Sequence, residues 1–192
     1  MLDKNSSLVP EQEIPVVRVK DKRFRVFIPY EDIQERIRIM AAAMTREYEG
    51  KKPIFLSVLT GSFMFAADLM KHINIDCEIA FTRLSSYSGT SSTGKVEMIM
   101  DFREEIKDRH VIILEDIVDS GTTLSRFLPI LEEHQPASIA IATLLIKPEA
   151  LKYKLDVPYV GFRISNEFII GYGLDYDGAG RNLKDIYQVV EA

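Results

Sequence analysis

The sequence predicts an α/β protein built on a doubly wound, mostly parallel sheet. Short apolar runs alternate along the chain with segments whose apolar residues recur every three or four positions, as in strands followed by amphipathic helices. One run, Val-Ile-Ile-Leu at 111–114, is wholly apolar, which is typical of a strand buried on both faces. The last quarter of the chain is less regular and favours a small cap over the sheet edge.

The first half of the chain begins loosely and then becomes periodic. Residues 1–15 are polar with two prolines, and we expect them to be loosely ordered on the surface. A helix is predicted over 31–48, where apolar residues share one face and Gly50 closes the helix. The other patterns predict strands over 24–28, 54–59, 78–84 and 95–100, a helix over 63–71 and a loop of small residues over 85–94.

The second half repeats the alternation without a linker. After the strand 111–114, Leu124, Phe127 and Leu131 recur at helical spacing and predict a helix. Strands are expected over 138–146, 159–164 and 168–172. We find no internal repeat, and therefore expect a single domain over residues 1–192 with a cap formed largely by C-terminal segments.

Composition excludes several classes of protein. The 192 residues include 24 basic and 29 acidic ones, and the resulting charge of −5 argues against nucleic-acid or anionic-membrane partners. Neither an 18-residue apolar run nor a signal peptide is visible. A single cysteine, Cys77, cannot form an internal disulfide. We therefore expect a cytoplasmic protein with no membrane contact.

A phosphate-binding turn is predicted between the strand 111–114 and the following helix. Open α/β sheets bind ligands at the carboxyl ends of their strands. Here Gly121 allows close backbone approach, while Ser120, Thr122 and Thr123 add hydroxyls beside the free N–H groups of a helix start. These features favour a phosphate ligand.

Two adjacent carboxylates precede that turn. Glu115 and Asp116 would repel a bare phosphate, but they suit sugar hydroxyls or Mg²⁺, which takes oxygen ligands and keeps several waters. A phosphate cradle beside such a pair indicates a phosphorylated ribose with a magnesium partner.

The whole stretch 111–124 resembles the phosphoribosyl-diphosphate (PRPP) signature of the type I phosphoribosyltransferases. Its part 115–124, Glu-Asp-Ile-Val-Asp-Ser-Gly-Thr-Thr-Leu, is most similar to that of the hypoxanthine (hypoxanthine-guanine) phosphoribosyltransferases. The resemblance runs from about residue 53 to residue 181. It implies the type I fold with a hood, transfer of a phosphoribosyl group from PRPP to N9 of a 6-oxopurine, Mg²⁺ as cofactor, and a homodimer or homotetramer.

The resemblance also assigns the parts that handle pyrophosphate and exclude water. The loop after the strand 54–59, with Thr60 and Gly61, resembles a pyrophosphate loop that often carries a non-proline cis peptide; many relatives have lysine where Thr60 stands. Ser86 and Tyr87 resemble the Ser-Tyr pair of a mobile lid, which would keep water from an oxocarbenium-like transition state.

Base recognition is implied by three further segments. Lys147 follows the strand 138–146, and its ammonium, which only donates hydrogen bonds, suits the 6-oxo oxygen of a purine. Phe168 would stack on the base, and Ile169 would present backbone groups to the base edge. Asp119 would face N7 as general base or proton holder.

The resemblance further places Asp175 near the base, the pyrophosphate and a second magnesium, and it lets Arg181 reach the pyrophosphate. The implied metal ligands are Glu115, Asp116 and Asp175. Three alternatives remain open: a guanine- or xanthine-preferring enzyme, a PRPP-sensing regulator of the same fold, and an inactive homologue.

Overall fold

The computed structural model describes residues 16–86, 96–100 and 105–190. Its elements are, in chain order, β1 (Val16–Val19), β2 (Lys22–Ile28), α1 (Tyr30–Glu47), β3 (Ile54–Leu59), α2 (Phe63–His72), β4 (Glu78–Ser86), β5 (Val96–Met100), β6 (His110–Val118), α3 (Thr122–Glu133), β7 (Ser138–Ile146), the 3₁₀ turn η1 (Pro148–Ala150), β8 (Tyr159–Arg163), β9 (Ile169–Ile170) and β10 (Ile186–Val189).

The larger sheet has six strands in the order β5-β4-β3-β6-β7-β8. All neighbours are parallel except β4 and β5, which are antiparallel. The chain builds outward from β3 through β4 to β5, then crosses to β6 and builds in the opposite direction through β7 and β8. The order therefore reverses between β3 and β6, and open α/β sheets bind ligands beside such a reversal.

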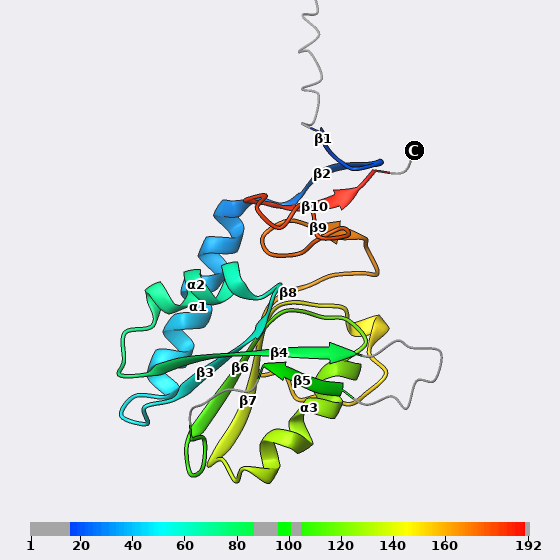
Figure 1. Cartoon of the computed structure of the whole chain (residues 1–192). Coiled ribbons are helices and arrows are strands. Elements are labelled where there is room, and N and C mark those ends of the chain that lie inside the picture. The colour runs from blue at the N-terminus through cyan, green and yellow to red at the C-terminus, as the bar shows by residue number, and fades with distance from the viewer. Residues whose placement is uncertain (1–15, 87–95, 101–104, 191–192) are drawn as a thin grey trace, which may run out of the picture.

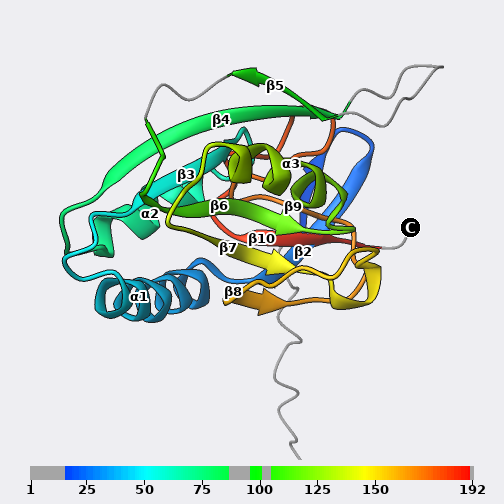
Figure 2. The same cartoon turned by 90° about the horizontal axis from the view of Figure 1, so that it is seen from below.

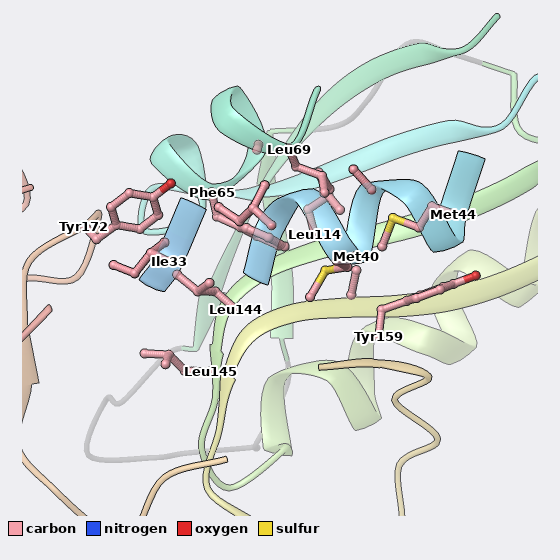
Figure 3. Close-up of a cluster of buried hydrophobic side chains, with 14 of the residues drawn as sticks. Ile33, Met40, Met44, Phe65, Leu69, Leu114, Leu144, Leu145, Tyr159 and Tyr172 are labelled. Carbon is pink, nitrogen blue, oxygen red and sulfur yellow. The ribbon is translucent and has the colours of Figure 1, made fainter. Parts of the chain in front are cut away.

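Helices cover both faces of this sheet, as the sequence predicted (Figure 2). Phe55 and Leu114 pack with α1 and α2 on one face, and Leu56 and Ile113 pack with α3 on the other. Figure 3 shows the first of these clusters, in which side chains of α1 and α2 meet those of the sheet. Because successive strand residues point to opposite faces, a strand covered on both faces must be apolar throughout.

The second sheet is a four-stranded antiparallel hood in the order β1-β2-β10-β9, beside the larger sheet (Figure 1). It confirms the predicted cap, but half of its strands come from the N-terminal side of the chain. The pairing of β1 with β2 places Val19 opposite Lys22, so the hairpin turn consists of Lys20 and Asp21. Lys20 has a positive φ of 54° without being glycine or asparagine, so this turn lacks the usual hairpin signature.

Strand β6 is longer than the sequence predicted. The apolar run suggested a strand over 111–114 followed by a turn, whereas β6 continues to Val118. Its pairing with β7 is the reason, because the register runs on through Glu115↔Thr143 and Val118↔Ile146. The two carboxylates Glu115 and Asp116 are therefore strand residues, and the turn is confined to the three residues that follow.

A buried polar network joins the hood to the helices of the larger sheet. The Tyr172 hydroxyl donates to Asp68 Oδ2 at 2.5 Å, and Gln34 of α1 donates to the same oxygen at 2.7 Å. Lys71 donates to Asp68 Oδ1 at 2.7 Å. Burial alone would raise the pKa of Asp68, but these three hydrogen bonds hold it below its usual value. Figure 3 shows the Tyr172 ring at the end of the apolar cluster beside Ile33 and Phe65.

The helices of the described ranges include none with the length and hydrophobicity needed to span a bilayer.

Candidate active site

A small pocket lies at the carboxyl end of β6, where the chain turns into α3. It has a volume of about 100 Å³ and is lined by Glu115, Ile117, Val118, Asp119, Ser120, Gly121, Thr122, Thr123 and Leu124. The structure therefore brings the predicted phosphate-binding residues around one cavity. The start of a helix with hydroxyl side chains beside it favours an anion there.

Gly121 is required at this turn for two reasons. Its φ of 73° is in the left-handed region, which glycine adopts without a steric penalty. A Cβ at this position would also lie 2.7 Å from Leu155 Cδ1. The hydroxyls on either side, Ser120 Oγ and Thr122 Oγ1, are 2.9 Å apart and hydrogen-bonded to each other. The turn thus holds its two hydroxyls together before any ligand binds.

Of the adjacent carboxylates of β6, Glu115 is buried and Asp116 is partly buried. Glu115 has 8% of its surface exposed. Burial first, and then repulsion from Asp116, raises the pKa of Glu115 well above its usual value. Burial likewise raises the pKa of Asp116, although its carboxylate accepts a hydrogen bond from the Ile117 N–H at 3.0 Å. Two adjacent acids whose pKa values are both raised favour a bound cation or the hydroxyls of a sugar, either of which would stabilise their ionised forms.

The loop after β3 reaches these carboxylates. The peptide bond between Leu59 and Thr60 is cis, as the resemblance implied for a pyrophosphate loop. Ser62 fixes the end of this loop, because its Oγ donates to the Val58 carbonyl and is 2.7 Å from Ser57 Oγ. Gly61 lies directly against Asp116: a Cβ on Gly61 would be 1.7 Å from Asp116 Oδ2. The loop and the acidic pair therefore form one surface.

The hood closes this surface from the other side. A Cβ on Gly173 would lie 2.0 Å from the Gly61 carbonyl oxygen, so the two backbones are in contact. Arg181 Nη1 donates to the Gly173 carbonyl at 2.6 Å, and Arg181 Nη2 forms an ion pair with Asp175 at 2.6 Å. The Arg181 charge lowers the pKa of Asp116 and the Asp175 charge raises it, so these groups share the crevice.

Lys147 and Asp119 form an ion pair at the mouth of the pocket. Lys147 Nζ lies 3.0 Å from Asp119 Oδ2, with only 13% of the lysine side chain exposed. The strand register explains the contact: Val118 of β6 lies opposite Ile146 of β7, so the next residue on each strand emerges at the same place. The residue predicted to bind the 6-oxo group and the residue predicted to face N7 are thus brought together.

The chain is similar to known proteins over most of its length. Residues 29–177 match the phosphoribosyl transferase domain family. The chain belongs to the phosphoribosyltransferase family.

Several relatives of the chain within that family are named for the purines on which they act. The chain is 44% identical to the hypoxanthine-guanine phosphoribosyltransferase of Lactococcus lactis, over 83% of this chain and 87% of the relative. It is 42% identical to the hypoxanthine-guanine-xanthine phosphoribosyltransferase of Tritrichomonas foetus, over 84% and 89%. The crystal structure of a hypoxanthine phosphoribosyltransferase from Staphylococcus aureus superposes with a TM-score of 0.83 at 40% identity, over 86% of this chain and 91% of that one.

The predicted base-binding residues of this phosphoribosyltransferase lie in the hood. Phe168 directly precedes β9 and is 42% exposed, which leaves part of its ring available for stacking. Ile169 lies on β9, the edge strand of the hood sheet, and its side chain is buried. An edge strand has backbone groups that no neighbouring strand pairs, which fits a role for Ile169 in contacting a base edge. Of the predicted lid, Ser86 ends β4, while its side chain and Tyr87 lie outside the described residues.

The acidic residues fit a magnesium ion of the kind the family uses. In the described ranges no three acidic, histidine or cysteine side chains converge as a ready metal cage, so Glu115, Asp116 and Asp175 do not form one. Mg²⁺ seldom needs such a cage, since it binds through one or two carboxylates together with water and substrate phosphates. The adjacent carboxylates of Glu115 and Asp116 supply oxygens of this type.

Sequence reasoning missed several residues that hold this phosphoribosyltransferase site together. Gly173 follows the predicted base-binding residues Phe168 and Ile169, and the sequence assigned it no role. Its φ of 100° and its contact with Gly61 show that it lets the hood approach the β3 loop. Asp68 and Tyr172 went unnoticed because no local pattern relates a helix residue to a hood residue more than a hundred positions away. The one sequence signal that could have drawn attention to Tyr172 is its position between two glycines, at 171 and 173.

Glu115→Gln is expected to stabilise the protein while impairing catalysis. A raised carboxyl pKa costs stability only where the group is ionised in the unfolded chain, so the penalty is absent at low pH and grows as the pH rises. In thermal melts without ligand, the melting temperature of the variant should therefore exceed that of the parent at about pH 8 and equal it at about pH 4. Each kcal/mol of added stability should raise the melting temperature by roughly 2–4 °C. Glu133→Gln, on an exposed residue of α3, is the control and should show neither change. A Glu115→Gln protein less stable than the parent at high pH would contradict the burial argument.

Proposed function

We propose that this phosphoribosyltransferase is a purine salvage enzyme that transfers the 5-phosphoribosyl group of PRPP to N9 of hypoxanthine and guanine. The products are IMP or GMP and pyrophosphate. The observation that carries the proposal is the Lys147–Asp119 pair, whose Asp119 also lines the pocket at the end of β6. A donor and an acceptor side by side match the 6-oxo oxygen and the N7 of one purine edge.

The reaction replaces one bond at the ribose C1′ with another. The bond from C1′ to the pyrophosphate oxygen breaks, and N9 of the base bonds to C1′, while the base loses one proton. We propose that Ser120, Gly121, Thr122 and Thr123 hold the 5′-phosphate and that Glu115 and Asp116 hold the ribose hydroxyls. Fixing the sugar against the incoming base in this way can supply much of the rate.

The pyrophosphate leaves on the side where the hood meets the β3 loop. We assign this position to the backbone of Thr60 and Gly61 together with Arg181, which the Gly173 carbonyl and Asp175 hold in place. Magnesium, held by Glu115, Asp116 and Asp175 with substrate oxygens, would neutralise the leaving charge. Because Thr60 stands where many relatives have lysine, backbone N–H groups carry the contact here.

The base is recognised by its 6-oxo edge and its face. Lys147 donates to the 6-oxo oxygen, Asp119 accepts the proton at N7, and Phe168 stacks on the ring while Ile169 contacts the base edge. An ammonium has no acceptor to offer adenine's 6-amino group. The preference at the 2-position stays open between hypoxanthine, guanine and xanthine.

The wider setting follows the family. We propose a single catalytic domain over residues 1–192 that works in the cytoplasm as a homodimer or homotetramer, with no nucleic-acid or membrane partner. Ser86 and Tyr87 would form its lid. Light scattering on the purified protein would give the number of subunits.

A rate assay tests the proposed reaction. The protein is mixed with PRPP and Mg²⁺, and nucleotide formation is followed separately with hypoxanthine, guanine, xanthine and adenine. Rapid conversion of hypoxanthine with little of adenine is expected. PRPP binding without turnover of any purine would overturn the assignment of the base and favour a PRPP sensor.

Lys147→Gln should weaken discrimination between 6-oxo- and 6-aminopurines. A glutamine amide can donate a hydrogen bond to a 6-oxo group or accept one from a 6-amino group, so it can contact either kind of purine. We expect kcat/KM for hypoxanthine to fall by roughly 10- to 100-fold, with adenine much less affected. Lys154→Gln, at an exposed lysine, is the matched control. An unchanged ratio of hypoxanthine to adenine rates would remove Lys147 from base recognition.

A further inference from the structure

Two aromatic rings flank Phe168, the predicted stacking residue. The Phe24 ring, which is fully buried in β2, has its centroid 6.1 Å from that of Phe168 at an interplanar angle of 38°. The Tyr176 ring meets Phe168 edge-on, with centroids 5.5 Å apart and an angle of 89°. Edge-to-face contact is a favourable and directional arrangement. The orientation of Phe168 therefore depends on where Tyr176 is held.

The turn between β1 and β2 holds Tyr176. The tyrosine hydroxyl donates to Asp21 Oδ1 at 2.8 Å, and the ammonium groups of Lys20 and Lys22 lie 5.6 and 5.7 Å from the ring centroid. Lys20 also donates to the Asp177 carbonyl at 2.8 Å and pairs with the Asp177 carboxylate at 3.3 Å. Five contacts thus link the two turn residues and the first residue of β2 to the Tyr176 ring and to Asp177.

These contacts are poorly suited to stabilising the fold. The side chains of Lys20 and Asp177 are 41% and 72% exposed, and ion pairs this exposed contribute little to stability. The hood already has a core of its own, in which Phe24, Ile170 and Tyr187 are buried. What the contacts do constrain is the angle at which Tyr176 meets Phe168.

We propose that the β1–β2 turn is a positioning element for the purine: Asp21, Lys20 and Lys22 hold Tyr176 edge-on against Phe168 and so fix the plane on which the base stacks. The proposal rests on the proposed function, in which Phe168 stacks on the base. The family match begins at residue 29, so this turn lies outside the segment that identifies the family. It would tune base affinity without touching the substrate.

Steady-state kinetics of Tyr176→Phe and Asp21→Ala test the proposal. Each variant removes the hydroxyl–carboxylate bond, and both keep the aromatic ring at position 176. We expect KM for hypoxanthine and for guanine to rise by the same factor, about three- to tenfold, because stacking does not depend on the exocyclic groups of a base. KM for PRPP and kcat should stay within about twofold of the parent, and the double variant should be no worse than either single variant.

Tyr187→Phe separates positioning from stability. It removes another tyrosine–aspartate bond of the hood, from Tyr187 to Asp185 at 3.0 Å, in which no residue of the β1–β2 turn takes part. It should lower the melting temperature at least as much as Tyr176→Phe while leaving KM for the base unchanged.

The proposal fails if Tyr176→Phe keeps the parental KM for both bases, if KM for PRPP rises equally, or if Tyr187→Phe raises the base KM as much. A parent protein that turns over no purine would instead overturn the proposed function, so the two failures are distinguishable.

Discussion

Asp119→Asn should lower kcat by about 100-fold or more while leaving KM for PRPP within a few-fold of the parent. An amide keeps the size of the carboxylate and can still accept the hydrogen bond from Lys147, which lies 3.0 Å away. It cannot take up the proton that the purine loses. The phosphate turn should therefore stay intact while proton transfer is lost.

Single-turnover kinetics with hypoxanthine would separate these effects, because they measure the chemical step without product release. Asp156→Asn, at an exposed aspartate after η1, serves as the charge-matched control and should behave as the parent. If kcat and PRPP affinity fell together in Asp119→Asn, the residue would be a structural part of the turn rather than a proton acceptor.

Gly61→Ala is expected to abolish most of the activity, by roughly 100-fold or more in kcat/KM for PRPP. The new methyl group would lie 1.7 Å from Asp116 Oδ2, far inside van der Waals contact, so the carboxylate or the loop must move. Asp116 has little freedom to do so, because it is partly buried and accepts a hydrogen bond from the Ile117 N–H. The hood presses on the same loop through Gly173, which limits movement in that direction.

Gly50→Ala is the control for adding a methyl group elsewhere, since nothing lies within 4 Å of the position its Cβ would occupy. It should lower stability through its positive φ but keep the parental kinetics. Full activity in Gly61→Ala would show that the β3 loop and Asp116 do not act together in binding PRPP.

Much of the larger sheet was predictable because its central strands β3, β6 and β7 are covered on both faces. The residues 111–114 are all fully buried, and only a wholly apolar run satisfies that environment. The helix predicted over 31–48 is observed as α1, Tyr30–Glu47, because one apolar face repeated through several turns. The strand predicted over 168–172 shrinks to Ile169–Ile170, since the two glycines that follow leave the sheet with positive φ.

The hood was only partly predictable for a different reason. Its strand β1 has four residues, its turn has no glycine or asparagine, and β10 shows no regular alternation of buried and exposed residues. The site shows the same division. The turn 119–123 could be found because one short segment contains it, whereas the contact of Gly61 with Asp116 and that of Lys147 with Asp119 depend on the order of the strands.

The hood sheet combines strands from both ends of the chain, which affects the order in which its parts can fold during synthesis. Strand β2 pairs with β10, so Val26 near the beginning of the chain lies opposite Tyr187 near its end. During synthesis on the ribosome, β2 can pair with β1 at once, but almost the whole chain must emerge, at roughly 5–20 residues per second, before its second partner β10 exists. The turn between β6 and α3, which we propose binds the sugar phosphate, is complete long before that. We therefore expect the proposed sugar-phosphate site to form before the proposed base site, whose strand β9 pairs with β10.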